Sequence, residues 1–234
     1  DSGELTSEAM QRGYETLRRF RDLAMSHDVE QIVTAATSAV REAPNGREFL
    51  QSIQDGLGID VDLVSGPEEA RLIYLGVLSG MSFGDRPHLV LDIGGGSTEL
   101  ILADGRDARA LTSTRVGAVR LQRDFVKDDP IPPDRRSFLQ AFIQGSLEPA
   151  VDKVHRRIKP GEIPVLVATS GTAMAIGALA ASEDERPPLK LHGYRVSRQR
   201  LDRVVEKLAT MTPEQRRDLS PINDRRAEII VPGA

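Results

Sequence analysis

The residues best suited by type and spacing to binding or catalysis form the run DIGGGSTE, which begins at Asp92 between two apolar stretches. A tight hairpin needs only one or two residues that accept positive φ, and further glycines cost backbone entropy. The surplus is explained if the backbone N–H groups of Gly94, Gly95 and Gly96 approach an anion closely. Ser97 would add a hydroxyl. A plain hairpin capped by its aspartate is the alternative, but the flanking aspartate and hydroxyls favour phosphate binding.

Asp92 also points to a metal. It follows the apolar run HLVL, so its charge would be costly to bury without a cationic neighbour. Mg²⁺ binds in proteins through one or two carboxylates, together with water molecules and phosphate oxygens. We therefore predict that Asp92 is a Mg²⁺ ligand next to the bound phosphate.

A second segment of small hydroxylated residues, TSGT, begins at Thr169 between an apolar strand and an apolar helix. The N–H groups at the start of a helix form a natural anion site. Taken alone, the same residues would more simply cap the helix. Together with the glycine loop, we expect Ser170, Gly171 and Thr172 to hold the opposite side of a phosphate chain.

Two weaker signals lie nearer the N-terminus. Glu68 and Glu69 follow Pro67 at the start of a predicted helix, where acidic residues contribute about 0.3–1 kcal/mol through the helix dipole alone. Arg41 follows the first predicted strand and is either a surface arginine or a bidentate phosphate clamp. The residue pattern by itself does not decide whether the glutamates and Arg41 have structural or functional roles.

Strands and helices that alternate along the chain must position these residues, and such alternation indicates an α/β fold. A polar, turn-rich stretch at 82–88 predicts two lobes, 1–85 and 86–234. The first lobe is expected to contain a helix at 7–25, a strand within 31–40, a helix at 47–57, a strand at 59–64 and a helix from Pro67. The second is expected to contain a hairpin at 88–104, a strand at 110–119, a helix at 134–158 kinked or split by Pro149, a strand, turn and helix at 165–180, and a helix opened by Ser197.

Composition excludes or disfavours several kinds of site and partner. The 234 residues include 31 basic and 35 acidic side chains, and this net charge of −4 argues against a nucleic-acid partner. The absence of cysteine excludes disulfides and thiolate sites. The longest apolar stretch, 173–181, is shorter than the roughly 20 residues that span a bilayer, and the first residues lack a signal-peptide pattern. We expect a cytoplasmic protein without a membrane partner, with basic pairs such as Arg216-Arg217 on solvated helix faces.

Several linked motifs occur in an order and spacing that make them far more specific than one glycine loop. They are ATSAVREAPNG, VSGPEEARLIYLGV, LVLDIGGGSTELILADG, TRVGAVRL and ATSGT, with a weaker continuation at RRAEIIVPGA. Together they resemble the exopolyphosphatase/guanosine pentaphosphate phosphohydrolase family of the actin-like phosphotransferase superfamily.

The resemblance implies a role for each candidate. Glu69 matches the family's catalytic base, which activates the attacking water, and Asp92 matches a carboxylate that holds Mg²⁺. Residues 94–97 match the loop around the phosphates, and Arg41 matches an arginine that contacts polyphosphate near its scissile end. Residues 170–172 match the loop that takes the adenosine position in related kinases.

The resemblance further implies two actin-like, ribonuclease H-like lobes with mixed sheets flanked by helices. The activity it implies is Mg²⁺-assisted release of terminal orthophosphate from inorganic polyphosphate or guanosine pentaphosphate. Such a reaction needs charge neutralisation and a positioned water more than covalent help. The family's opening glycine- and serine-containing loop has no counterpart here, so the first lobe is expected to be incomplete at its N-terminus.

Two other functions remain open. An actin-like small-molecule kinase would usually carry a doubled glycine in its nucleotide loop, whereas Gly171 stands alone. A non-catalytic sensor of polyphosphate or of an alarmone would bind tightly without turnover and would tolerate Glu69→Gln. The sequence does not choose between polyphosphate and guanosine pentaphosphate, and it leaves the metal and a homodimeric state undecided.

Overall fold

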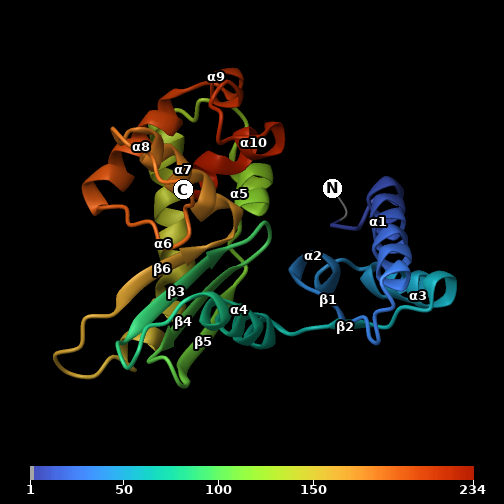
Figure 1. The fold of residues 1–234 in the computed structure, drawn as a ribbon. Coiled ribbons are helices and arrows are strands. Elements are labelled where there is room, and N and C mark those ends of the chain that lie inside the picture. The colour runs from blue at the N-terminus through green and yellow to red at the C-terminus, as the bar shows by residue number, and fades with distance from the viewer. Residues whose placement is uncertain (1–2) are drawn as a thin grey trace. The chain divides into compact units, whose positions relative to one another are not determined.

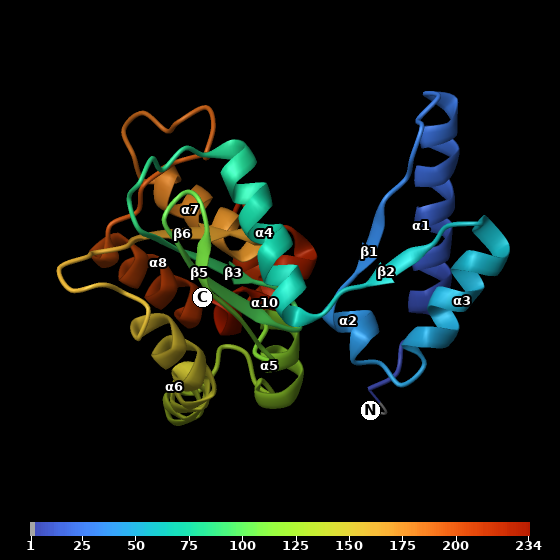
Figure 2. The same ribbon diagram turned by 90° about the horizontal axis from the view of Figure 1, so that it is seen from below.

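The computed structural model describes residues 3–234 and divides into two compact units, one ending at Glu69 and the other beginning at Ala70 (Figures 1 and 2). This division lies earlier than the boundary predicted at residue 85. The reason is that Ala70 and Tyr74 are buried against strands of the second unit. None of the helices in residues 3–234 has the length and apolar character needed to cross a membrane.

The first unit is built on two short parallel strands, in which Thr34 pairs with Val61 and Ala36 with Leu63. Its core joins Phe49, Ile53 and Leu57 to side chains of the first helix. The hydroxyl oxygen of Thr6 caps that helix by accepting from Ala9 N–H at 3.1 Å. The elements are α1 (Ser7–Ser26), β1 (Thr34–Ala36), α2 (Ser38–Arg41), α3 (Gly46–Leu57), β2 (Val61–Leu63) and the first turn of α4 (Gly66–Gly80).

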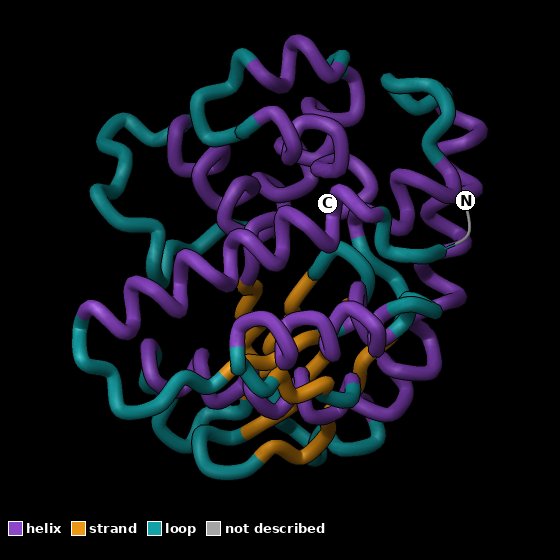
Figure 3. The backbone as a smooth tube through the Cα atoms, turned by 90° about the vertical axis from the view of Figure 1, so that its right-hand side faces the viewer, coloured by secondary structure: helices purple, strands orange, loops and turns teal. Residues whose placement is uncertain are grey.

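The second unit is built on a mixed four-stranded sheet in the order β5-β4-β3-β6, bordered by helices (Figure 3). β3, β4 and β5 are antiparallel neighbours, and β6 runs parallel to β3. The strands are β3 (His88–Ile93), β4 (Thr98–Ala103), β5 (Ala108–Thr114) and β6 (Val165–Thr169). The helices after α4 are α5 (Ala118–Phe125), α6 (Pro133–His155), α7 (Ser170–Ser182), α8 (Arg198–Thr210), α9 (Pro213–Arg217) and α10 (Asp224–Gly233).

Both faces of this sheet are covered. On one face, Val90 and Ile101 pack against Ala70 of α4. On the other, Leu100 packs with Ala150 of α6. Every residue of the central strand β4 is buried as a result, which is typical of a strand covered on both sides. The predicted α/β class is confirmed.

Several elements differ from the sequence prediction. The third strand of the second unit ends at Thr114, and α5 follows where the strand was expected to continue. α6 continues through Pro149 as one helix of 23 residues, because a proline removes a single backbone donor and burial of Ala150 and Val154 secures the following turn. Helices α9 and α10 were not predicted.

Arg216 corrects another expectation, because its side chain is fully buried and not on a solvated helix face. Its guanidinium donates to both carboxylate oxygens of Asp129 at 2.6 Å. It also donates to three backbone carbonyls, those of Leu208 at 2.9 Å, Met211 at 2.7 Å and Ala227 at 3.2 Å. One buried cation therefore ties the segment before α6 to α8 and α10.

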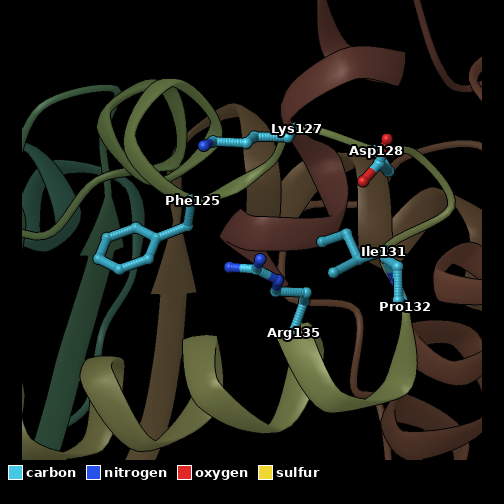
Figure 4. Close-up of a pocket in the computed structure, with 6 residues that line it drawn as sticks. All are labelled: Phe125, Lys127, Asp128, Ile131, Pro132 and Arg135. Carbon is cyan, nitrogen blue, oxygen red and sulfur yellow. The ribbon is translucent and has the colours of Figure 1, made fainter.

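A small pocket lies beside this segment, between α5 and α6 (Figure 4). Its volume is about 20 Å³, which is room for about one water molecule. It is therefore too small to be a substrate site. Its lining residues are Phe125, Lys127, Asp128, Ile131, Pro132 and Arg135.

Removing the carboxylate partner of a buried arginine leaves an uncompensated charge. We expect Asp129→Ala to lower the free energy of unfolding by about 3–5 kcal/mol. As a matched control, Glu206→Ala breaks the more exposed pair with Arg136 and should cost less than about 1 kcal/mol. Urea unfolding of both variants measures the difference, and equal losses would show that the buried pair has no special role.

Candidate active site

Four polar residues form a row across the sheet of the second unit. Asp92 lies opposite Glu99, and Glu99 lies opposite Ser113, in antiparallel register. Asp92 also pairs with Thr169 in parallel register. Because side chains of paired positions point to the same face of a sheet, all four residues face the same side. The predicted Asp92 and the TSGT segment are thus neighbours at the carboxyl ends of two parallel strands.

The next row inward on the same face is apolar. It contains Leu111, Ile101, Val90 and Val167, which belong to the cluster around Ala70 of α4. The polar row therefore lies at the end of this apolar layer, directly beside the loops that follow β3 and β6. This is the edge of an α/β sheet at which ligands commonly bind.

The centre of the row is a pair of carboxylates. Glu99 has only 1% of its surface exposed, and Ser113 Oγ donates to its Oε1 at 2.7 Å. Like charges placed directly across two strands destabilise a sheet unless they are compensated, and both carboxylates have interaction partners within the protein. Glu99 is not among the residues selected from the sequence, although a hairpin closed by the loop at 94–97 already implies that it lies opposite Asp92.

This pair suits the predicted Mg²⁺ in its chemistry. Two carboxylates are what the ion ordinarily takes from a protein when phosphate oxygens and water complete its coordination. Among residues 3–234, no group of three or more His, Asp or Glu residues is placed to bind a metal by itself. The residues present therefore fit an ion shared with a phosphate substrate better than an ion enclosed by protein.

The triglycine loop is held in place by the start of α5. Gly94 N–H donates to Ser97 O at 2.9 Å and closes the turn. Ala118 N–H donates to Gly94 O at 2.9 Å, and Val119 N–H donates to Gly95 O at 3.0 Å. The first N–H groups of α5 thus bind the loop, and the Gly94 N–H serves the turn. Ser97, predicted to add a hydroxyl at the phosphate, has only 2% of its surface exposed.

Close approach of the backbone explains part of the glycine content. A Cβ on Gly117, just before α5, would lie 2.5 Å from Gly95 O and 2.6 Å from the carbonyl carbon of Gly96. A Cβ on Gly95 would lie 3.2 Å from Val119 Cγ2, and the φ of Gly95 is outside the left-handed region. The sequence attributes the surplus glycines to an anion, whereas the structure shows that α5 also packs closely against one of them, Gly95.

The loop at 169–172 is joined to the first loop by Ser170. Its Oγ donates to Ile93 O at 2.9 Å, so the hydroxyl predicted to meet a phosphate connects the two loops. Ser170 also has a φ of 72°, a conformation that costs a non-glycine residue about 1–2 kcal/mol. The remainder of the loop contacts α10.

Arg226 of α10 makes that contact. A Cβ on Gly171 would overlap its guanidinium, and its Nη1 lies 3.4 Å from Thr172 Oγ1. Thr172 is buried, with 1% of its surface exposed. The single glycine of TSGT is therefore needed for the approach of an arginine that the sequence analysis did not select.

Two other predicted residues meet in the first unit. Arg41, the last residue of α2, donates from Nη1 to Glu69 Oε2 at 3.2 Å and to Val64 O at 2.7 Å. Both residues are candidates from the sequence, but their pairing is a finding of the structure.

A larger cavity of about 440 Å³ lies on the opposite face of the sheet from the polar row. Leu91 and Ile93 of β3, Leu139 and Ile143 of α6 and Val231 of α10 are among its mainly apolar lining residues. Such a mainly apolar surface suits an apolar group better than a phosphate chain.

The tight contact at Gly117 leads to a prediction. We expect Gly117→Ala to lower the free energy of unfolding by about 1–3 kcal/mol, because the added methyl meets backbone atoms that cannot move aside cheaply. Gly145→Ala in α6 is the control, since a Cβ there meets nothing within 4 Å, and it should be neutral or stabilise the protein by up to about 1 kcal/mol. Thermal unfolding compares them. A harmless Gly117→Ala would contradict the close packing.

Comparison with known proteins places the chain in a family. The model of the Ppx/GppA phosphatase family matches residues 1–234. Exopolyphosphatase 2 of Mycobacterium tuberculosis is 31% identical over 239 residues, covering 100% of this chain and 73% of that protein. The guanosine-5'-triphosphate,3'-diphosphate pyrophosphatase of Photobacterium profundum is 39% identical over 150 residues, covering 64% of this chain and 30% of that protein. The chain thus spans less than a third of one curated relative and about three quarters of another.

Solved structures agree. An exopolyphosphatase from Cytophaga hutchinsonii has a TM-score of 0.89 at 27% identity, covering 98% of this chain and 73% of that one. The Ppx/GppA family member of Aquifex aeolicus has a TM-score of 0.80 at 26% identity, covering 100% and 73%. The two-lobed α/β fold expected from the motifs is the fold of these proteins. The chain belongs to the Ppx/GppA phosphatase family.

Proposed function

We propose that the protein is a phosphoanhydride hydrolase that releases terminal orthophosphate from inorganic polyphosphate or guanosine pentaphosphate. The observation that carries this proposal is the cross-strand carboxylate pair of Asp92 and Glu99 beside two joined loops. Family membership and the names of the M. tuberculosis and P. profundum relatives support the substrate class. Both substrates present the same terminal phosphoanhydride.

Asp92 and Glu99 are the residues that would hold Mg²⁺, and Ser113 fixes one oxygen of Glu99. The ion, when bound, would supply charge neutralisation at the phosphate oxygens. The loops at 94–97 and 169–172 are proposed to bind the phosphate chain, through backbone N–H groups that the turn and α5 do not use. The hydroxyl of Ser170 is assigned to joining these loops.

Glu69 is proposed as the general base. It accepts a proton from the attacking water while the water oxygen bonds to the terminal phosphorus. The bond from phosphorus to the bridging oxygen breaks, and the electron pair leaves with the shortened chain. A phosphate is a fair leaving group, so no strong general acid is needed.

Glu69→Gln tests this role. In the full-length protein with Mg²⁺, we expect it to lower kcat for phosphate release by about 10²- to 10⁴-fold while the affinity for polyphosphate stays within about threefold, because the amide retains the shape but cannot take a proton. Release of phosphate from long-chain polyphosphate and guanosine pentaphosphate, measured side by side, gives kcat and the preferred substrate.

Glu68→Gln, one residue earlier in α4, is the matched control and should keep kcat within about threefold, since a carboxylate in the first turn of a helix contributes mainly through the helix dipole. Full activity of Glu69→Gln would remove it as the base. Binding without any turnover by the unaltered protein would support a sensor, and transfer of phosphate from ATP to an acceptor would support a kinase.

A further inference from the structure

Arg41 makes two contacts through a single nitrogen. Its Nη1 donates to Val64 O at 2.7 Å and to Glu69 Oε2 at 3.2 Å. An η nitrogen of arginine carries two hydrogens, so these two acceptors use both. The Nη1 group of the guanidinium is therefore fully used by the backbone carbonyl of Val64 and by the proposed base, Glu69.

The other edge of the guanidinium has different surroundings. Nε and Nη2 carry three of the five N–H groups, and within residues 3–234 the structure shows no acceptor for them. The Arg41 side chain is 22% exposed, so this edge is reachable by a ligand. The parallel donors of such an edge match two oxygens of a phosphate in a bidentate contact.

The hydrogen bond to Val64 O fixes the position of the Arg41 side chain. Val64 directly follows β2, and its own N–H donates to Ala36 O of β1 at 3.1 Å. The carbonyl that receives Arg41 thus belongs to a backbone fixed by the parallel strand pair. Because Arg41 ends the helix that follows β1, it connects the carboxyl ends of the two strands.

Glu69 is oriented by this arrangement. One carboxylate oxygen, Oε2, is bound by Arg41. The other, Oε1, receives no hydrogen bond from any residue in the described part of the chain, and the Glu69 side chain is 14% exposed. The pair therefore leaves one defined oxygen to take a proton.

We propose that Arg41 is a positioning residue for Glu69 and links the base to the substrate. Nη1 holds Oε2, so that Oε1 takes the proton of the attacking water, while the Nε and Nη2 edge binds the terminal phosphate that this water attacks. If Arg41 only bound phosphate, the Nε and Nη2 contact would suffice and the Nη1 contact to Glu69 would not be needed. The inference rests on the proposed hydrolase function.

The test is a double-mutant cycle on the full-length protein with Mg²⁺ and long-chain polyphosphate. Arg41→Lys keeps the positive charge but offers one donor group that cannot reach carbonyl, base and phosphate together. We expect it to lower kcat about 10- to 100-fold, as for loss of a charge-assisted hydrogen bond. Glu69→Asp withdraws the carboxylate by one methylene and should break the same contact.

The expected result is that Arg41→Lys lowers kcat strongly in the presence of Glu69 and by a clearly smaller factor once Glu69→Asp is present, because the two changes share the Arg41–Glu69 contact and only the phosphate contact of Arg41 is then left to lose. Arg47→Lys, at an exposed position of α3 in the same unit, is the control and should leave kcat within about twofold. If Arg41→Lys does not fold, judged by circular dichroism and thermal unfolding, Arg41→Gln takes its place in the cycle, since an amide can still donate to Val64 O.

Two results would overturn the inference. One is an Arg41 variant that raises KM while kcat stays within twofold, which would mean that Arg41 only binds substrate. The other is a pair of kcat effects that multiply in the double variant. These outcomes differ from failure of the hydrolase proposal, in which the unaltered protein releases no phosphate or Glu69→Gln retains full activity.

Discussion

Two carboxylates on one face of a sheet, at positions directly across neighbouring strands, repel each other, and the rest of the second unit depends on how Asp92 and Glu99 are held. The hairpin turn closed by Gly94 and Ser97 fixes their register, and the hydroxyl of Ser113 orients one of the two. A sheet covered by helices on both faces keeps the pair from relaxing into solvent. The two carboxylates are therefore held in a fixed geometry, which is what the proposed Mg²⁺ site requires.

Local patterns predicted the elements that have strong local signals. The hairpin, the long α6 and the capped starts of α1 and α8 follow from apolar periodicity and turn chemistry. The missed α5 has only eight residues, too few for periodicity to show. The boundary between the units was placed too late because α4 reads as one continuous helix, and only the tertiary burial of Ala70 shows which side it joins. The burial of Arg216 likewise depends on the carboxylate of Asp129, which lies 87 residues away in sequence.

The candidate site was predictable in its residue types more than in its bonding. Asp92, Glu69 and Arg41 were chosen from their positions after strands or at a helix start. Glu99 required knowledge of strand register. Whether a serine hydroxyl faces a ligand or another loop is decided by a bond between residues 77 apart in sequence, as at Ser170, and no local pattern encodes this. The pairing of Arg41 with Glu69 spans 28 residues and was hidden for the same reason.

The geometry of Ser170 has a mechanical consequence for the two loops. Ser170, with a φ of 72°, has a strained backbone conformation. Its hydroxyl donates a hydrogen bond to the carbonyl of Ile93, just before the glycine loop. A change in the conformation of the loop after β6 would therefore break this hydrogen bond or displace the loop after β3. If the two loops bind the phosphate chain as proposed, we expect an anion bound by one loop to restrict the movement of the other as well.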